Sequence, residues 1–141
     1  FGFLGWHWHP ARIFLGAVGS IPLGFLLGGL LLQLAVAGYW APALILPLYY
    51  LTDAGVTLTR RLLRGEKVWE AHREHFYQVA VQAGHRHSGV SAAIALTNVI
   101  LIGLSVWSLD SPLLAILAAA GCVAVLIGWM HLSPRVKRRE A

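Results

Sequence analysis

The stretch from Gly89 to Met130 decides the fold, and it reads GVSAAIALTNVILIGLSVW-SLDS-PLLAILAAAGCVAVLIGWM. Two apolar runs of 19 residues each flank a short polar turn that ends just before Pro112. An α-helix rises about 1.5 Å per residue, so each run is long enough to cross a hydrocarbon core of roughly 30 Å. The stretch therefore predicts two transmembrane helices joined as a hairpin.

Two more apolar runs of similar length precede this hairpin, at 18–38 and 41–59, with Tyr39 and Trp40 between them. They predict a second hairpin. Of the 141 residues, 57% are hydrophobic and only 12% are charged, about half the roughly 25% charge of a water-soluble domain. We therefore expect an all-α integral membrane fold with four transmembrane helices in two hairpins.

The basic residues all fall on one side of this four-span topology. Arg12 precedes the first span, six lie in the loop 60–88, and four lie in the tail 131–141, whereas Asp110 is the only charge on the other side. Cytoplasmic segments carry the excess of Lys and Arg. We expect a multi-pass protein of the cell membrane with both termini and the loop in the cytoplasm. The net charge of +5 then indicates a lipid surface and no nucleic acid.

The chain opens on Phe1 in mid-pattern, without an initiator Met or a signal peptide. We expect residues 1–141 to be one membrane portion of a larger domain, that is, a fragment. The single cysteine, Cys122, lies in an apolar run and says nothing about the redox compartment.

The first candidate for chemistry is the segment from Arg12 to Ser20, which opens the first span. A glycine-containing helix start offers unpaired backbone N–H groups and a positive dipole end, which suit a phosphate. Helix packing is the alternative, because Gly16, Ser20, Gly24 and Gly28 place small residues on one narrow face.

The second candidate is the loop around His72 and His75. As a helix, the segment is amphipathic, and both histidines lie on its less polar side with Phe76. Imidazoles placed there can donate to a phosphate or transfer protons near neutral pH. An interfacial helix with snorkelling rings is one alternative. A His-x-x-His metal pair is another, although further ligands are not evident.

The third candidate is Asp53, an acid inside the second predicted span. Because a charge at that depth is costly, we expect it to face a bundle interior or a polar cavity. A hydrogen bond between helices is the alternative to a functional role.

Both motif segments resemble those of one enzyme family. The segment Pro10–Ser20, PARIFLGAVGS, resembles the R-I-F-x-G-D-x-G-S signature of the polyprenyl-phosphate N-acetylhexosamine-1-phosphate transferases, within glycosyl transferase family 4. The segment Ala71–Gln78, AHREHFYQ, resembles the cytoplasmic histidine loop of that family in its H-R-x-H-x-Y-Q form. Asp53 followed by Arg60 and Arg61 is similar to the aspartate and arginine pair that leads into this loop.

The resemblance implies transfer of a sugar 1-phosphate from a UDP-N-acetylhexosamine to polyprenyl phosphate, with Mg²⁺ bridging the diphosphate. It further implies substrate-binding roles for two sets of residues. The floor of the site would be formed by Arg12, Gly16, Gly19 and Ser20. The cap over the diphosphate would be formed by His72, Arg73 and His75. The sequence of the histidine loop is similar to that of family members that initiate O-antigen-like surface polysaccharides. The other branch of the family acts in cell-wall synthesis.

Two departures from the family pattern bear on activity. Ala17 stands where the family has an aspartate that binds magnesium, and a methyl group cannot coordinate a hard cation. The paired aspartates of the family lie upstream of the matching region. We expect this chain alone to be inactive, with a missing N-terminal half or a second copy as its partner.

The alternative is a non-catalytic membrane module that binds lipid phosphate or a partner membrane protein. A channel or transporter comes third, because only Asp53 lies well inside a span.

Overall fold

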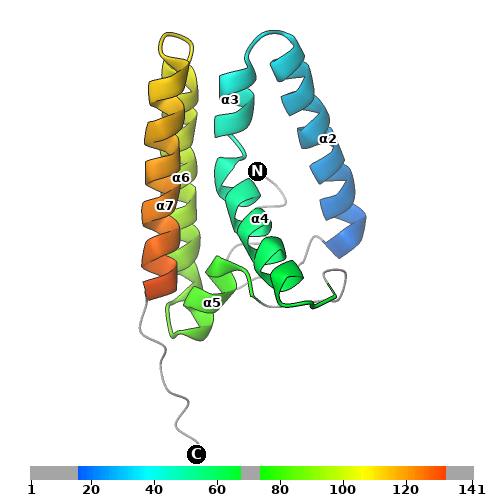
Figure 1. Ribbon diagram of the computed structural model, residues 1–141, viewed down its shortest axis with the longest axis vertical. Coiled ribbons are helices and arrows are strands. Elements are labelled where there is room, and N and C mark those ends of the chain that lie inside the picture. Colours follow the sequence, from blue (N-terminus) through cyan, green and yellow to red (C-terminus); the bar gives the residue numbers. More distant parts are fainter. Residues whose placement is uncertain (1–15, 68–73, 133–141) are drawn as a thin grey trace, which may run out of the picture. The chain divides into compact units, whose positions relative to one another are not determined.

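The computed structural model describes residues 16–67 and 74–132, with the side chain of Ala17 excepted. Every regular element in these ranges is an α-helix (Figure 1). The helices are α2 (Gly16–Val36), α3 (Trp40–Ile45), α4 (Leu48–Leu63), α5 (Phe76–Gln82), α6 (His87–Trp107) and α7 (Pro112–Leu132). The chain divides into two compact units, 1–40 and 41–141.

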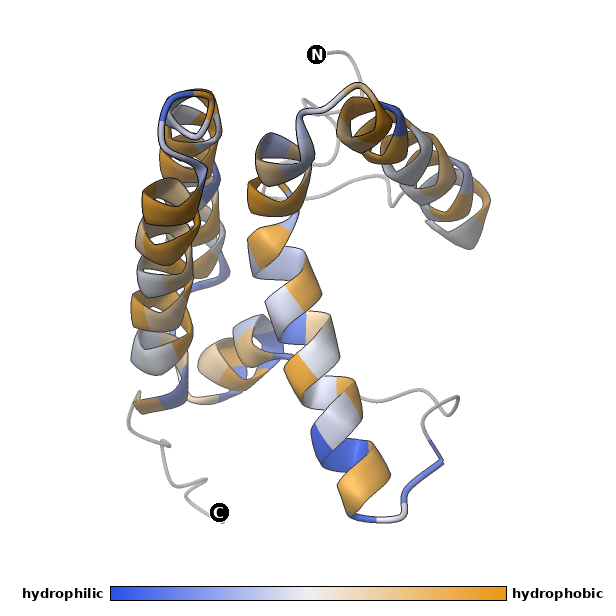
Figure 2. Cartoon of the chain, turned by 45° about the horizontal axis from the view of Figure 1, so that its top comes forward, coloured by the Kyte–Doolittle hydropathy of each residue, from blue (hydrophilic) through white to orange (hydrophobic). Residues whose placement is uncertain are grey.

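Three of the described helices are long and apolar enough to cross a membrane, and they are α2 over Val18–Val36, α6 and α7. Figure 2 shows mostly hydrophobic residues along α6 and α7. Their bounds agree with the predicted spans at 89–107 and 112–130 to within two residues. The protein is therefore a helical membrane protein, and the hairpin of α6 and α7 is confirmed.

The second predicted span, 41–59, is not one continuous helix. It is divided into α3, with six residues, and α4, with sixteen, and neither is long enough to cross a membrane alone. The reason is Pro47, which cannot donate a hydrogen bond to the preceding turn and restricts the residue before it. Helix α4 also continues to Leu63, four residues beyond the predicted end, and so carries Arg60 and Arg61 in its last turn.

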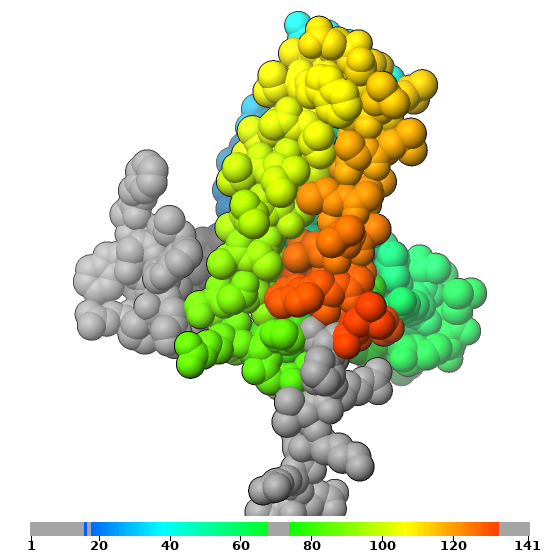
Figure 3. Space-filling model, turned by 90° about the vertical axis from the view of Figure 1, so that its left-hand side faces the viewer, coloured from blue at the N-terminus to red at the C-terminus, as the bar shows by residue number. Residues whose placement is uncertain are grey.

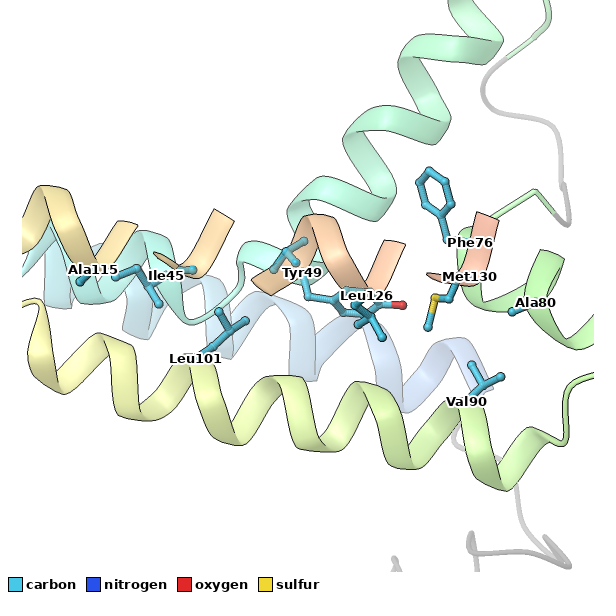
Figure 4. Close-up of a cluster of buried hydrophobic side chains, with 11 residues drawn as sticks. Ile45, Tyr49, Phe76, Ala80, Val90, Leu101, Ala115, Leu126 and Met130 are labelled. Atoms are coloured by element: carbon cyan, nitrogen blue, oxygen red, sulfur yellow. The ribbon is translucent and has the colours of Figure 1, made fainter. Parts of the chain in front are cut away.

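Helix α7 is the centre of the second unit, because it packs against α4, α5 and α6. Ala115 and Ala119 are fully buried, and their small side chains let neighbouring backbones approach closely. Figure 3 shows α6 and α7 side by side along their length. Figure 4 shows the cluster that they bury, in which Tyr49 of α4 and Phe76 of α5 extend the core towards the end of the bundle that carries α5.

The histidine segment does not form the predicted helix through His75. Helix α5 begins at Phe76, His75 is its extended N-cap, and the helix has only seven residues. Upstream, Gly65 ends α4 with a φ of +71°, a conformation that favours glycine. The N–H groups of Gly65 and Glu66 donate to Leu62 and Arg61, which is a Schellman motif. The chain thus turns sharply after α4.

Candidate functional site

The centre of the site is the carboxylate of Asp53, which α4 holds at the start of α5. Asp53 is only 6% exposed. Its Oδ1 accepts a hydrogen bond of 2.9 Å from the backbone N–H of Phe76, the first residue of α5. Its Oδ2 lies 3.2 Å from Nδ1 of His75. A carboxylate at a helix start satisfies an N–H that the helix itself cannot satisfy. Asp53 therefore fixes both the start of α5 and the imidazole before it.

His75 is held from a second direction by its own helix. Its backbone N–H donates to Oε1 of Gln78 at 3.4 Å. This is the capping-box contact, in which the side chain of the third helical residue accepts from the N-cap N–H. Its ring stacks on Tyr77, with ring centroids 5.9 Å apart. The imidazole is partly exposed. One edge therefore meets a carboxylate, and the ring remains accessible to an outside ligand.

The end of α4 carries a second polar group, which is built around Arg61. Arg61 is 5% exposed. Its Nε lies 2.9 Å from Oε2 of Glu66, and it donates to the carbonyl of Lys67 at 3.0 Å. A buried guanidinium requires such partners, because desolvation without them costs several kcal/mol. The pair fixes the turn that follows α4.

Arg64 closes the loop that begins at this turn. Its guanidinium lies 3.0 Å from Glu66 and donates to Glu74, ten residues further along the chain. The hydrogen bond with Glu74 raises the pKa of Arg64, so the guanidinium stays charged. Together with Asp53, this contact ties the residues just before α5 to α4.

Phe76 completes the contact between α4 and α5. Its ring is 4% exposed, and the guanidinium of Arg60 lies 5.2 Å from the ring centroid, a favourable cation–π distance. His131 of α7 meets the same ring edge to face at 6.3 Å. Three helices thus hold the residue that directly follows His75.

The structure covers only part of the residues predicted for the site. Gly16, Gly19 and Ser20 lie in the first turns of α2, in the first unit. Asp53 and His75 lie together in the second unit, although 22 residues separate them. Arg12, His72, Arg73, most of the basic tail and the side chain of Ala17 lie outside the described residues.

Magnesium has no evident ligand set in the described ranges. These ranges hold no group of three or more His, Cys, Asp or Glu side chains that could bind a metal ion. Residue 17 is an alanine, which offers no oxygen from its side chain. The residues that are described therefore do not fit the ion that the family resemblance implies.

Sequence reasoning missed the link between Asp53 and the backbone of Phe76. It included Gln78 in the histidine-loop motif but missed its contact with the backbone of His75. The available signal was the single acid in an apolar run, 22 residues before His75. That signal indicates a need for a partner, but it does not say which backbone group supplies it.

Residues 1–35 match the model of glycosyl transferase family 4. No curated protein and no solved structure matches the chain significantly. The family match covers the segment Pro10–Ser20 and so confirms its resemblance to glycosyl transferase family 4, whereas the histidine loop lies outside the match. The match covers about a quarter of the 141 residues and shows what this part of the helical membrane protein is similar to.

Proposed function

We propose that this chain is the C-terminal membrane portion of a transferase that moves a sugar 1-phosphate from a UDP-N-acetylhexosamine to polyprenyl phosphate. An oxygen of the prenyl phosphate attacks the phosphorus that bears the sugar. The bond from this phosphorus to the UMP oxygen breaks, and UMP leaves with the electron pair. The observation that carries the proposal is the family match at residues 1–35, which includes the phosphate-type motif at Arg12–Ser20.

The start of α2 supplies the first set of groups for this reaction. Gly16, Gly19 and Ser20 lie in the first turns of α2, whose first-turn backbone N–H groups have no partner within the helix. Arg12 adds a positive charge nearby in the sequence. Such a helix start favours an anion. These residues are proposed to form the floor under the diphosphate, on the cytoplasmic side of the cell membrane.

The histidine loop supplies the second set. The carboxylate of Asp53 lies 3.2 Å from Nδ1 of His75 and so orients the imidazole ring. An imidazole oriented through Nδ1 can offer its Nε2 N–H to a phosphate oxygen, and a hydrogen bond to that anion is charge-assisted. We assign this role to His75 and extend it to His72 and Arg73 by the resemblance. Phosphoryl transfer relies mainly on such positioned positive groups and a metal.

No part of the proposed reaction is assigned to a magnesium ion bound by this chain. The ion would neutralise charge on the diphosphate, as it does in other phosphoryl transfers. Because Ala17 and the other described residues provide no ligand set, the same observations favour a second candidate. This candidate is a non-catalytic module that binds lipid phosphate or a partner membrane protein.

Equilibrium binding separates the two candidates. The full-length protein in detergent would be titrated with UDP-N-acetylglucosamine and, separately, with polyprenyl phosphate. A transferase portion binds both, and His75→Ala weakens the sugar nucleotide about tenfold, the typical effect of one charge-assisted hydrogen bond. His87→Ala, at an exposed histidine of α6, serves as the matched control and leaves binding unchanged. Binding of the prenyl phosphate alone would favour the non-catalytic module.

A further inference from the structure

A cavity of about 500 Å³ lies in the second unit, where α4, α5 and α6 meet. Helix α4 contributes Tyr49 and Asp53, α5 contributes Tyr77, and α6 contributes Ser91, Ile94 and Asn98. Ser91 lies one turn from the start of α6 and Asn98 two turns further along. The cavity therefore runs from the end of the bundle that carries α5 into the apolar span, which suits an amphiphilic ligand.

Two buried polar atoms at this cavity have no hydrogen-bond partner in the described parts of the chain. One is the phenol oxygen of Tyr49, a side chain that is only 2% exposed. The other is Oδ1 of Asn98, whose Nδ2 donates to the hydroxyl of Tyr50 at 3.0 Å. Buried polar groups are nearly always satisfied, so each such atom requires an explanation. Their shared position at the cavity indicates a ligand that satisfies both.

The chemistry of the lining selects the ligand. The described lining residues include a carboxylate and three tyrosine rings but no Lys, Arg or His. A cation held among these side chains would meet a carboxylate and aromatic faces. A primary ammonium carries three donors and no acceptor. Asn98 Oδ1, the Tyr49 hydroxyl and the Asp53 carboxylate, which retains free lone pairs, offer three acceptors.

We propose that this cavity binds the primary ammonium headgroup of an aminophospholipid such as phosphatidylethanolamine. The lipid is distinct from the prenyl phosphate substrate, which has no ammonium group to donate to these acceptors. It sits beside the carboxylate that orients His75. The inference rests on the cavity and does not depend on the proposed transferase reaction.

Lipid retention tests this site without sugar nucleotide or prenyl phosphate. The full chain would be reconstituted in bilayers with equal parts of phosphatidylethanolamine, phosphatidylcholine and phosphatidylglycerol, then extracted, and its bound lipids would be measured by mass spectrometry. We expect enrichment of phosphatidylethanolamine over both others, because a trimethylammonium has no N–H donor. Tyr49→Phe and Asn98→Leu should each lower this enrichment about tenfold. Tyr39→Phe, at a half-exposed tyrosine outside the cavity, should leave it unchanged.

Three results would overturn the proposal. They are equal retention of the ethanolamine and choline lipids, enrichment that survives both substitutions, and displacement of the lipid by an equal concentration of free ethanolamine. The last result would assign the site to a small soluble amine in place of a lipid. Tyr49→Phe keeps the aromatic ring in the core, so loss of enrichment with unchanged thermal unfolding reports on the hydroxyl and not on folding.

Discussion

Asp53 in α4 accepts the backbone N–H of Phe76 at 2.9 Å, across 23 residues of sequence. The bond joins a buried acid of a broken span to the first residue of the short helix that follows the histidine segment. It satisfies two groups at once, the costly carboxylate and a helix N–H without an internal partner. The position of His75 is thus set by α4 and not by the loop alone.

Substitution of Asp53 tests this bond through stability. Asp53→Leu should lower the free energy of unfolding by about 1–3 kcal/mol, because it leaves the Phe76 N–H buried without an acceptor. Asp53→Asn keeps a carbonyl oxygen in the same place and should cost clearly less. Thermal unfolding of the full chain in detergent measures both. Equal stability of the Leu variant and the natural protein would rule out the bond.

Gly65 is predicted to be required by the backbone at the end of α4. Its φ is +71° and no side chain crowds it, so Gly65→Ala should cost about 1–2 kcal/mol from left-handed strain alone. Gly103→Ala is the control, since Gly103 lies within α6 with equal space and an ordinary φ. The same unfolding assay should show little loss for that variant. An unchanged free energy of unfolding in Gly65→Ala would show that residue 65 does not adopt the left-handed conformation.

Glu66 is predicted to matter more than Glu74, although both pair with arginines. Glu66→Gln removes the carboxylate that pairs with Arg61, whose side chain is only 6% exposed. The free energy of unfolding should fall by roughly 1–3 kcal/mol, a range that is lowered by the partial exposure of Glu66. Glu74→Gln weakens the ion pair with the exposed Arg64 and should cost less, because exposed ion pairs contribute little to stability. Unfolding at low and high salt would measure both. A larger effect for Glu74 would contradict the burial pattern.

The apolar runs allowed the sequence to predict three long helices closely, because length and composition alone determine whether a helix can span a bilayer. The break at Pro47 was missed, because the apolar run continues through it. The start of α5 at Phe76 was also missed, because the helical periodicity continues through His75. The contact of Asp53 with Phe76 joins distant residues through a backbone group, which no local pattern encodes.

Pro47 should therefore control the division between α3 and α4. Pro47→Ala restores an N–H that can donate to the carbonyl of Ala43, and we expect one continuous helix from α3 into α4. Hydrogen exchange at residues 46–50 should slow. Pro42→Ala is the control, because Pro42 lies in the first turn of α3, where a missing N–H has little effect. Unchanged exchange in Pro47→Ala would assign the break to tertiary packing.

The measurement that tests the transferase proposal most directly is sugar-phosphate transfer in membranes by the full-length protein. The assay supplies UDP-N-acetylhexosamines, polyprenyl phosphate and Mg²⁺ to the natural protein, to Ala17→Asp and to Ala17→Asn as a near-isosteric control without the carboxylate charge. We predict prenyl-linked product from Ala17→Asp alone, because a carboxylate restores the oxygen that magnesium prefers. The absence of product from all three proteins, each inserted and folded, would contradict the proposal and favour the non-catalytic module.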